Sequence, residues 1–340
     1  MKKFLSLLLA LCLLASFAAC GEETAKPASP ETTGAAPSGA ATEESASNFV
    51  SDAGREALDG KKIIFIGNSF TQAANCVIDQ GYTKLEQKDR VNDQGYFSQL
   101  CQNAGLDVDV TAWTFGGHDV SDIFAEVCPA NKDCKGKSHP SYLTDRYYDY
   151  VAIQCYLERE CTGDLETYLK PVMDIFREAN PNVKFLLLVP HMAHEKGYTW
   201  VDQIPHMQEI GFTIVNWGGM IQDIVTQKTE VPGAKQPYGR PTIVISKDET
   251  DGYHQNILAG YLTALMTFCA ITGDSAVGQP WEFCYDPSVH PKFYDLETYK
   301  SKRYIYEPYT NFDEVFKSEA DMRGLQELTD QYIAQFNGGN

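Results

Sequence analysis

The sequence predicts an α/β fold in which a five-stranded parallel sheet carries helices on both faces. Two observations lead to this prediction. Apolar, β-branched segments alternate along the chain with amphipathic segments of helical period, as they do in repeated strand–helix–strand units. One strand segment, VKFLLLVP at residues 183–190, is apolar on both faces, as expected for a strand that lies between two helical layers.

Each expected strand is a short apolar run that stops at glycine, proline or polar residues. In chain order these runs are KKIIFIG (61–67), DVDVTAW (107–113), YDYVAIQ (148–154), VKFLLLVP (183–190) and FTIVNW (212–217).

The expected helices have apolar residues at helical spacing, and two of them end at a glycine that can cap the last turn. They are GYFSQLCQNAGL (95–106, with Gly105), LETYLKPVMDIFREAN (165–180), GGMIQDIVTQ (218–227) and HQNILAGYLTALMTFCAITG (254–273, with Gly273). Residues 275–340, rich in Tyr, Phe, Asp and Lys, form a C-terminal extension in which residues 311–336 are expected to be helical.

The first nineteen residues have the pattern of an export signal. Lys2 and Lys3 precede an apolar run that is too short to span a bilayer. The following FAAC resembles the lipobox of bacterial lipoproteins, which implies that Cys20 is lipidated and becomes the mature N-terminus. Phe17 stands where lipoboxes usually carry Leu, Val or Ile, so ordinary cleavage after Ala18 is the alternative. We therefore expect a chain that is anchored at the bacterial cell surface, or secreted if Cys20 is not lipidated.

Residues 20–58 are mainly Ala, Thr, Glu, Pro, Ser and Gly, and they predict a disordered tether. The remaining residues, 59–340, are expected to form one domain of a size that is normal for an α/β enzyme. The net charge of −18 disfavours nucleic acid as a partner, because a phosphate backbone would be repelled.

Ten cysteines occur in the sequence, and none has the paired spacing of a zinc site. An exported chain with an even set of cysteines permits disulfides, and Cys128 and Cys134 could close a small loop. Cys101 and Cys269 lie on apolar helical faces and are expected to be buried thiols. No metal or cofactor is expected.

The candidate site lies where the strands end, because the carboxyl ends of parallel strands converge at one edge of the sheet. The first strand ends at Ser69, the second at Gly117 and His118, and the third at Gln154. Ser69 could instead be a helix N-cap in a capping box with the residue three positions on, since a serine hydroxyl satisfies free backbone N–H groups there.

A base and an orienting acid are expected just before the long helix at 254–273. In DETDGYH, Asp251 and His254 are three residues apart, close enough for the carboxylate to hold the imidazole Nδ1–H. The histidine Nε2 could then accept a proton from a serine hydroxyl. Asp251 as a helix cap and His254 as a surface residue are the alternatives.

These residues together resemble the SGNH, or GDSL-type, hydrolases. The resemblance rests on GNSFT after the first strand, a glycine after the second, an amide after the third and D-x-x-H before the last long helix. It implies a three-layer, flavodoxin-like fold and a serine esterase. In this sequence it implies Ser69 as nucleophile, His254 as base and Asp251 as its orienter. The oxyanion hole would combine the N–H groups of Ser69 and Gly117 with the side-chain amide of Gln154.

The sequence departs from the family pattern in two places. The block is Gly-Asn-Ser-Phe rather than Gly-Asp-Ser-Leu, and Gln154 replaces the usual asparagine with a stem longer by one methylene. The G-x-S-x-G elbow of the α/β-hydrolases does not fit, because Thr71 stands at the second glycine. His118 and His191 are further candidates for substrate contact, and HMAHE (191–195) is read as a loop that lacks the order of a zinc motif.

We therefore expect an esterase that removes a small acyl group, above all acetyl, from a carbohydrate or glycoconjugate. Its substrate class follows from the resemblance and the expected location alone. The alternative is a non-catalytic solute- or glycan-binding lipoprotein on a degenerate hydrolase fold.

Overall fold

The structure is a computed structural model that describes residues 49–71, 95–114, 117–124, 127, 143, 145–155, 164–234, 238, 257–285 and 319–338. The side chains of Ser69 and Ile257 are not part of this description. The expected signal peptide, most of the tether, Asp251, His254 and the residues around Cys128 lie outside the described residues.

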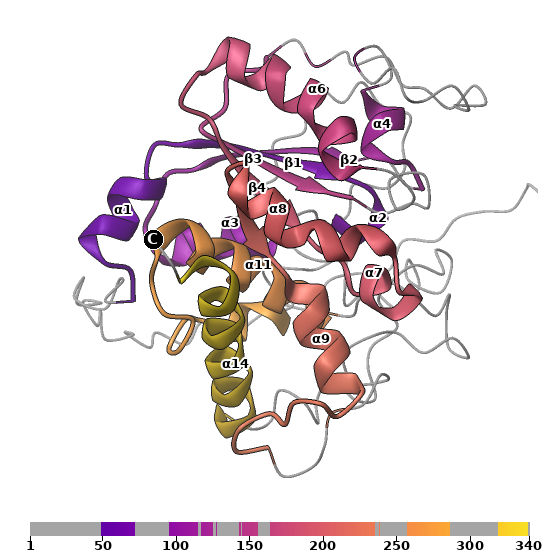
Figure 1. Ribbon diagram of the computed structural model, residues 1–340. Coiled ribbons are helices and arrows are strands. Elements are labelled where there is room, and N and C mark those ends of the chain that lie inside the picture. The colour runs from indigo at the N-terminus through magenta and orange to yellow at the C-terminus, as the bar shows by residue number, and fades with distance from the viewer. Residues whose placement is uncertain are drawn as a thin grey trace, which may run out of the picture. The chain divides into compact units, whose positions relative to one another are not determined.

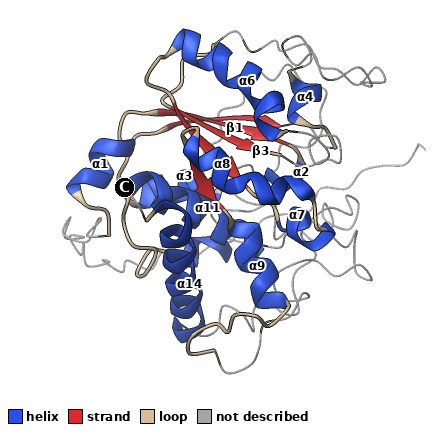
Figure 2. Ribbon diagram, in the orientation of Figure 1, coloured by secondary structure: helices blue, strands red, loops and turns tan. Residues whose placement is uncertain are grey.

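All five expected strands form, and they pair into one parallel sheet, drawn in red in Figure 2. The order of the strands in this sheet is β2-β1-β3-β4-β5. This is the order of flavodoxin-like sheets, and it confirms the predicted fold class. The strands are β1 (Lys62–Gly67), β2 (Asp109–Thr114), β3 (Tyr150–Gln154), β4 (Lys184–Leu188) and β5 (Phe212–Val215).

Helices cover both faces of this sheet. Successive residues of a strand point to opposite faces, and here the residues on both faces are apolar, so both faces must be covered. In β1, Ile63 and Phe65 belong to one buried cluster, and Ile64 and Ile66 belong to the other. One face is covered by α4 (Val120–Ile123), α6 (Leu165–Ala179) and α8 (Ile204–Glu209). The other is covered by α3 (Tyr96–Asn103), α9 (Trp217–Val225), α11 (Ile257–Thr272) and α14 (Glu319–Asn337) (Figure 1).

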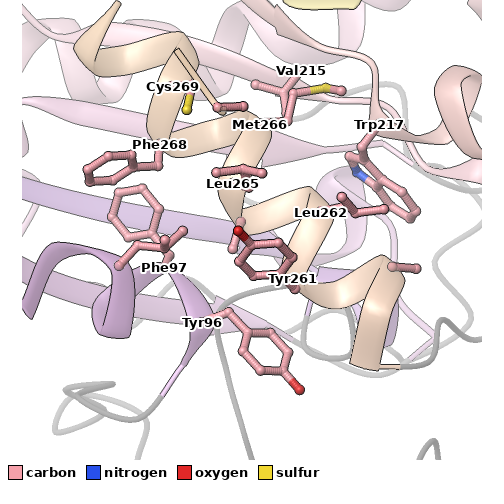
Figure 3. Close-up of a cluster of buried hydrophobic side chains, with 14 of the residues drawn as sticks. Tyr96, Phe97, Val215, Trp217, Tyr261, Leu262, Leu265, Met266, Phe268 and Cys269 are labelled. Atoms are coloured by element: carbon pink, nitrogen blue, oxygen red, sulfur yellow. The ribbon is translucent and has the colours of Figure 1, made fainter. Parts of the chain in front are cut away.

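The long helix α11 is the centre of the second layer. Leu262, Leu265 and Phe268 are fully buried, and the ring of Phe268 lies 6.3 Å from that of Phe97 on α3, centroid to centroid (Figure 3). Gly273 follows with φ +74, the left-handed conformation expected of a helix-ending glycine. The predicted apolar helix is therefore confirmed over the described part of its range.

The C-terminal helix α14 closes the open edge of β5. The Asn337 side chain accepts a hydrogen bond from the Ile214 N–H at 3.0 Å and donates one to the Ile214 carbonyl at 2.8 Å. It thereby occupies backbone groups that an edge strand would otherwise leave exposed. Part of the C-terminal extension thus belongs to the folded unit.

The folded unit begins earlier than the sequence predicts. A short helix, α1 (Asp52–Leu58), lies within the range expected to be tether. Leu58 is fully buried, and the Tyr150 hydroxyl donates to the carbonyl of Ala57 at 2.7 Å. Leu58 is the only large apolar residue among these seven, so the amphipathic signal is weak and composition alone could not place this boundary.

Four cysteines in the described part of the chain are buried: Cys101, Cys155, Cys269 and Cys284. Burial raises the pKa of each of the Cys101, Cys269 and Cys284 thiols well above its ordinary value. Cys101 and Cys269 are therefore the buried thiols that the sequence predicts. Over the same residues, no helix is long and apolar enough to cross a membrane.

Candidate active site

The carboxyl ends of β1, β2 and β3 lie level with one another. Gly67 is in register with Thr114, and the residue before it, Ile66, is in register with Ile153. The next residue along β3 is Gln154, the last of that strand. Three of the predicted site segments therefore meet at one edge of the sheet, as the sequence reasoning requires.

Ser69 is the first residue of α2 (Ser69–Thr71), one residue beyond the intervening Asn68. The side chain of Asn68 accepts a hydrogen bond from the Phe70 N–H at 3.0 Å, which satisfies a free donor at the start of this turn. The side chain that caps this turn is therefore that of Asn68. The alternative given above had assigned the capping role to Ser69.

Gln154 is anchored to the serine turn through both ends of its amide. Its Nε2 donates to Asn68 Oδ1 at 3.1 Å, and its Oε1 accepts from the Thr71 hydroxyl at 2.5 Å. All three side chains are almost completely buried. The long glutamine stem is thus accommodated in the interior at the end of β3, beside the segment that carries Ser69.

Gly67 makes this arrangement possible. A Cβ at position 67 would lie 2.3 Å from Thr71 Oγ1, 3.0 Å from Gln154 Cβ and 3.2 Å from Gln154 Oε1. Only a residue without a side chain leaves space for the hydrogen bond between the threonine and the glutamine. The glycine of the GNSFT block is therefore required by close packing.

The segment after β2 is tied to the same turn. Asn68 Nδ2 donates to the carbonyl of His118 at 3.2 Å, across 50 residues of sequence. The preceding residue, Gly117, is exposed and has φ +71, a conformation that favours glycine. Asp119 then starts α4 with a capping box that it forms with Asp122. Gly117 is therefore held near the serine turn by elements on both of its sides.

His191 follows β4 and opens α7 (His191–Lys196), so the HMAHE segment is a helix and its reading as a loop was wrong. Its ring is 1% exposed and lies 5.7 Å from the ring of Phe70 and 5.8 Å from that of Trp217, centroid to centroid. Pro190 is the N-cap of α7 and has an extended backbone conformation. A proline at this position suggested a loop, and the pattern of apolar residues does not mark the start of the helix. His191 therefore supports the residue next to Ser69.

His194, one turn later on α7, packs against α9. Its Nε2 lies 2.7 Å from Asn216 Oδ1, which also accepts from the Gly219 N–H at 3.1 Å. Since this oxygen is an acceptor, the histidine Nε2 carries the proton. Burial lowers the pKa of His194, although the bond to Asn216 acts in the opposite direction. The His194 side chain therefore bridges α7 and α9.

The described part of the site places the buried side-chain amides of Asn68 and Gln154 at the ends of β1 and β3, next to the turn that carries Ser69. The Asn68 side chain links the segments that carry Ser69, Gly117 and Gln154. The catalytic roles of these three residues stay predictions. The sequence reasoning missed the roles of Asn68 and Thr71. Both lie in GNSFT, but a hydrogen bond to a residue more than 80 positions away depends on strand register, which a motif does not reveal.

No family model and no curated protein sequence matches the chain. Among solved structures it is similar to an acetylxylan esterase from Geobacillus stearothermophilus, with 17% identity and a TM-score of 0.40 over 63% of this chain and 95% of that chain. It is also similar to a GDSL-like lipase from Parabacteroides merdae, with 15% identity and a TM-score of 0.39 over 64% of this chain and 97% of that chain. Similarity at this level assigns no residue a role and no substrate to this chain.

Proposed function

We propose that the chain is a serine esterase that removes a small acyl group, above all acetyl, from a carbohydrate or glycoconjugate. One observation supports this most strongly. The turn that carries Ser69, the segment that carries Gly117 and the amide of Gln154 are joined through a single buried side chain, Asn68. A network of this kind fixes donors relative to a nucleophile, which a cap or a solvated strand end does not require.

In the proposed reaction the Ser69 hydroxyl attacks the carbonyl carbon of the ester, and His254 Nε2 takes the hydroxyl proton. Asp251 accepts the Nδ1–H of His254 and stabilises the imidazolium. The tetrahedral intermediate then expels the alcohol, which receives the proton from His254. Water, activated by the same histidine, hydrolyses the acyl-serine and restores the free enzyme.

The negative oxygen of the intermediate is assigned to the N–H groups of Ser69 and Gly117 and to Gln154 Nε2. A primary amide carries two N–H donors, and Asn68 takes one of those on Gln154. The second is the donor that we assign to the oxyanion. Because Gln154 is almost completely buried, its dipole would act in a medium of low dielectric constant, where it stabilises charge more strongly than in water.

The substrate class rests on the resemblance to SGNH hydrolases and on the proposed location. A tether from a lipidated Cys20 would hold the enzyme at the bacterial surface, where acylated polysaccharides are accessible. Metabolic labelling with a radioactive fatty acid tests the anchor: wild type should incorporate label and Cys20→Ala should not. Labelling of both proteins, or of neither, would contradict lipidation at Cys20.

A panel of acetyl, butyryl and longer-chain esters, on aryl and sugar alcohols, tests the activity. The wild-type protein should prefer acetyl esters, and Ser69→Ala should lower kcat by at least about 1000-fold without unfolding the protein. Ser275→Ala is the matched control, because Ser275 follows the far end of α11, about 24 Å along that helix from its start. Binding of an acetylated glycan without any turnover would favour the glycan-binding alternative.

The pH profile tests His254 separately. If this histidine must be neutral to act as base, kcat/KM should rise with an apparent pKa of about 6 to 7. A flat profile from pH 5 to 8, with chemistry shown to be rate-limiting, would remove His254 from that role.

A further inference from the structure

The hydrogen bonds at the end of β1 form a chain whose direction can be deduced. Asn68 contacts two backbone groups of fixed character: the Phe70 N–H, which can only donate, and the His118 carbonyl, which can only accept. The oxygen of Asn68 must therefore face Phe70, and its NH2 group must face His118. The orientation of this amide is set by the backbone on both sides.

This orientation determines that of Gln154. The atom of Gln154 next to Asn68 Oδ1 must be a donor, so it is Nε2, at 3.1 Å. The carbonyl oxygen Oε1 then faces Thr71, whose hydroxyl must donate to it, at 2.5 Å. Every bond in the chain thus has a single allowed direction, and Thr71 forms its last link.

We propose that Thr71 is a positioning residue for the reaction. The Thr71 hydroxyl holds Gln154 Oε1 and so fixes the orientation of the amide. Nε2 then faces the proposed oxyanion at the strand end, and the carbonyl oxygen faces away from it. This inference rests on the proposed esterase function and extends it to a buried residue that acts through Gln154.

The need for such a residue follows from the length of glutamine. Its side chain has one more rotatable bond than asparagine, and its terminal torsion has a broad, shallow preference. The hydrogen bond to Asn68 holds the amide at its nitrogen end only. With that bond alone, the carboxamide group could still rotate. Thr71 removes this freedom, and Gly67 leaves the space in which the bond forms.

Thr71→Val tests the proposal, because it replaces the hydroxyl with a methyl group of similar size. We expect kcat on an acetyl ester to fall about 10- to 100-fold with KM changed less than about 2-fold, a smaller loss than removal of an oxyanion donor. Thr71→Ser restores the hydroxyl and should recover most of the lost rate. Thr267→Val is the control, since Thr267 is equally buried but its hydroxyl bonds only the Thr263 carbonyl within α11.

A double-mutant cycle distinguishes positioning from general destabilisation. If Thr71 acts through Gln154, Thr71→Val should change kcat less than about 2-fold in a Gln154→Leu background. Losses that multiply would contradict the proposal, as would a Thr71→Val protein with the wild-type kcat.

A third measurement does not depend on esterase activity. The Gln154 side-chain amide protons, assigned in NMR spectra by their absence in Gln154→Leu, should exchange with solvent at least about tenfold faster in Thr71→Val than in wild type or Thr267→Val. Unchanged exchange would overturn the role of Thr71 whether or not the chain hydrolyses esters. Rapid exchange in a chain that hydrolyses no ester would refute the proposed function and leave the network intact.

Discussion

At the scale of single residues, the chain departs from the SGNH pattern at Gln154, and the structure explains how the longer side chain fits. Its amide is buried and anchored at both ends within the serine turn. The sequence predicted that Ser69, Gly117 and Gln154 would share one edge of the sheet, because this follows from where strands end. The contacts of Asn68 and Thr71 were not predictable, because they depend on strand register and rotamers.

If Gln154 donates to the oxyanion, that bond forms chiefly in the transition state, so substitutions of Gln154 should act on kcat far more than on KM. Gln154→Ala should lower kcat about 100- to 1000-fold. Gln154→Asn keeps the donor but shortens its reach by about 1.5 Å, so it should also fail. Gln154→Glu brings a negative charge and should be at least as damaging as alanine. Near-wild-type rates for all three variants would show that Gln154 is not the amide donor to the oxyanion.

Asn68→Asp tests the link between the serine turn and Gly117. An aspartate at this position keeps the acceptor for Phe70 but loses the donor to the His118 carbonyl and places a charge against it. We expect a loss of about 1–3 kcal/mol in the free energy of unfolding and a fall in kcat.

Asn180→Asp is the matched control for Asn68→Asp. Asn180 is also buried, accepts from the N–H two residues on, and donates to a backbone carbonyl, that of Tyr148. It lies before β4, at the opposite end of the strands from the site. Urea unfolding should show a similar loss of stability for both variants. An equal loss of kcat in both would show that Asn68 has no special connection with the site.

At the scale of elements, the strands and the long helices were predicted well, because each has a strong apolar pattern. The short helices were not, and α1 and α7 show the reason. α1 has too few apolar residues to distinguish it from the tether, and α7 follows a proline and carries two histidines. Tertiary contacts stabilise both, and no local pattern in the sequence contains that information.

The packing of α9 against the start of α7 depends on Gly218. A Cβ there would lie 2.2 Å from the Pro190 carbonyl carbon and 2.3 Å from the His191 nitrogen, both of them backbone atoms that cannot swing aside. Gly218→Ala should therefore cost about 1–3 kcal/mol or more in the free energy of unfolding. It should also lower kcat, because His191 packs against Phe70, the neighbour of the proposed nucleophile Ser69.

Gly324→Ala is the control for Gly218→Ala. Its Cβ would meet the carbonyl oxygen of Pro232, so α14 should be destabilised by a similar clash away from the strand ends. Thermal unfolding and kcat should be measured for both variants. If Gly324→Ala lowered kcat as much as Gly218→Ala at a temperature where both are folded, the specific coupling through His191 would be excluded.

At the scale of the whole molecule, half-buried His194 links stability to pH. Because burial lowers its pKa in the folded chain, the unfolded chain binds a proton at a higher pH than the folded chain does. Titration of His194 therefore does not change the free energy of unfolding well above the ordinary histidine pKa of about 6.5. Below that pH it lowers the free energy of unfolding. His194→Gln, which can still donate to Asn216, should reduce this acid destabilisation.

Urea unfolding at pH 7.5 and pH 5.5 measures this effect. His206→Gln is the comparison, because the hydrogen bond to Glu166 raises the pKa of exposed His206. That bond stabilises the folded chain at low pH and is lost as the pH rises through the raised value, so its removal should not reduce acid destabilisation. Identical pH dependence in wild type and His194→Gln would contradict the assignment to His194.

The central claim is that Ser69 is the nucleophile of an acyl-transfer site, and covalent labelling tests it most directly. The folded protein would be treated with an aryl fluorophosphonate, which reacts with activated serines by losing fluoride, and the modified peptide would be located by mass spectrometry. We predict a single adduct on Ser69, no adduct in Ser69→Ala, and labelling slowed at least about 100-fold in His254→Ala. Hydrolysis of acetyl esters at the wild-type rate by Ser69→Ala, or an adduct confined to another serine, would contradict the account.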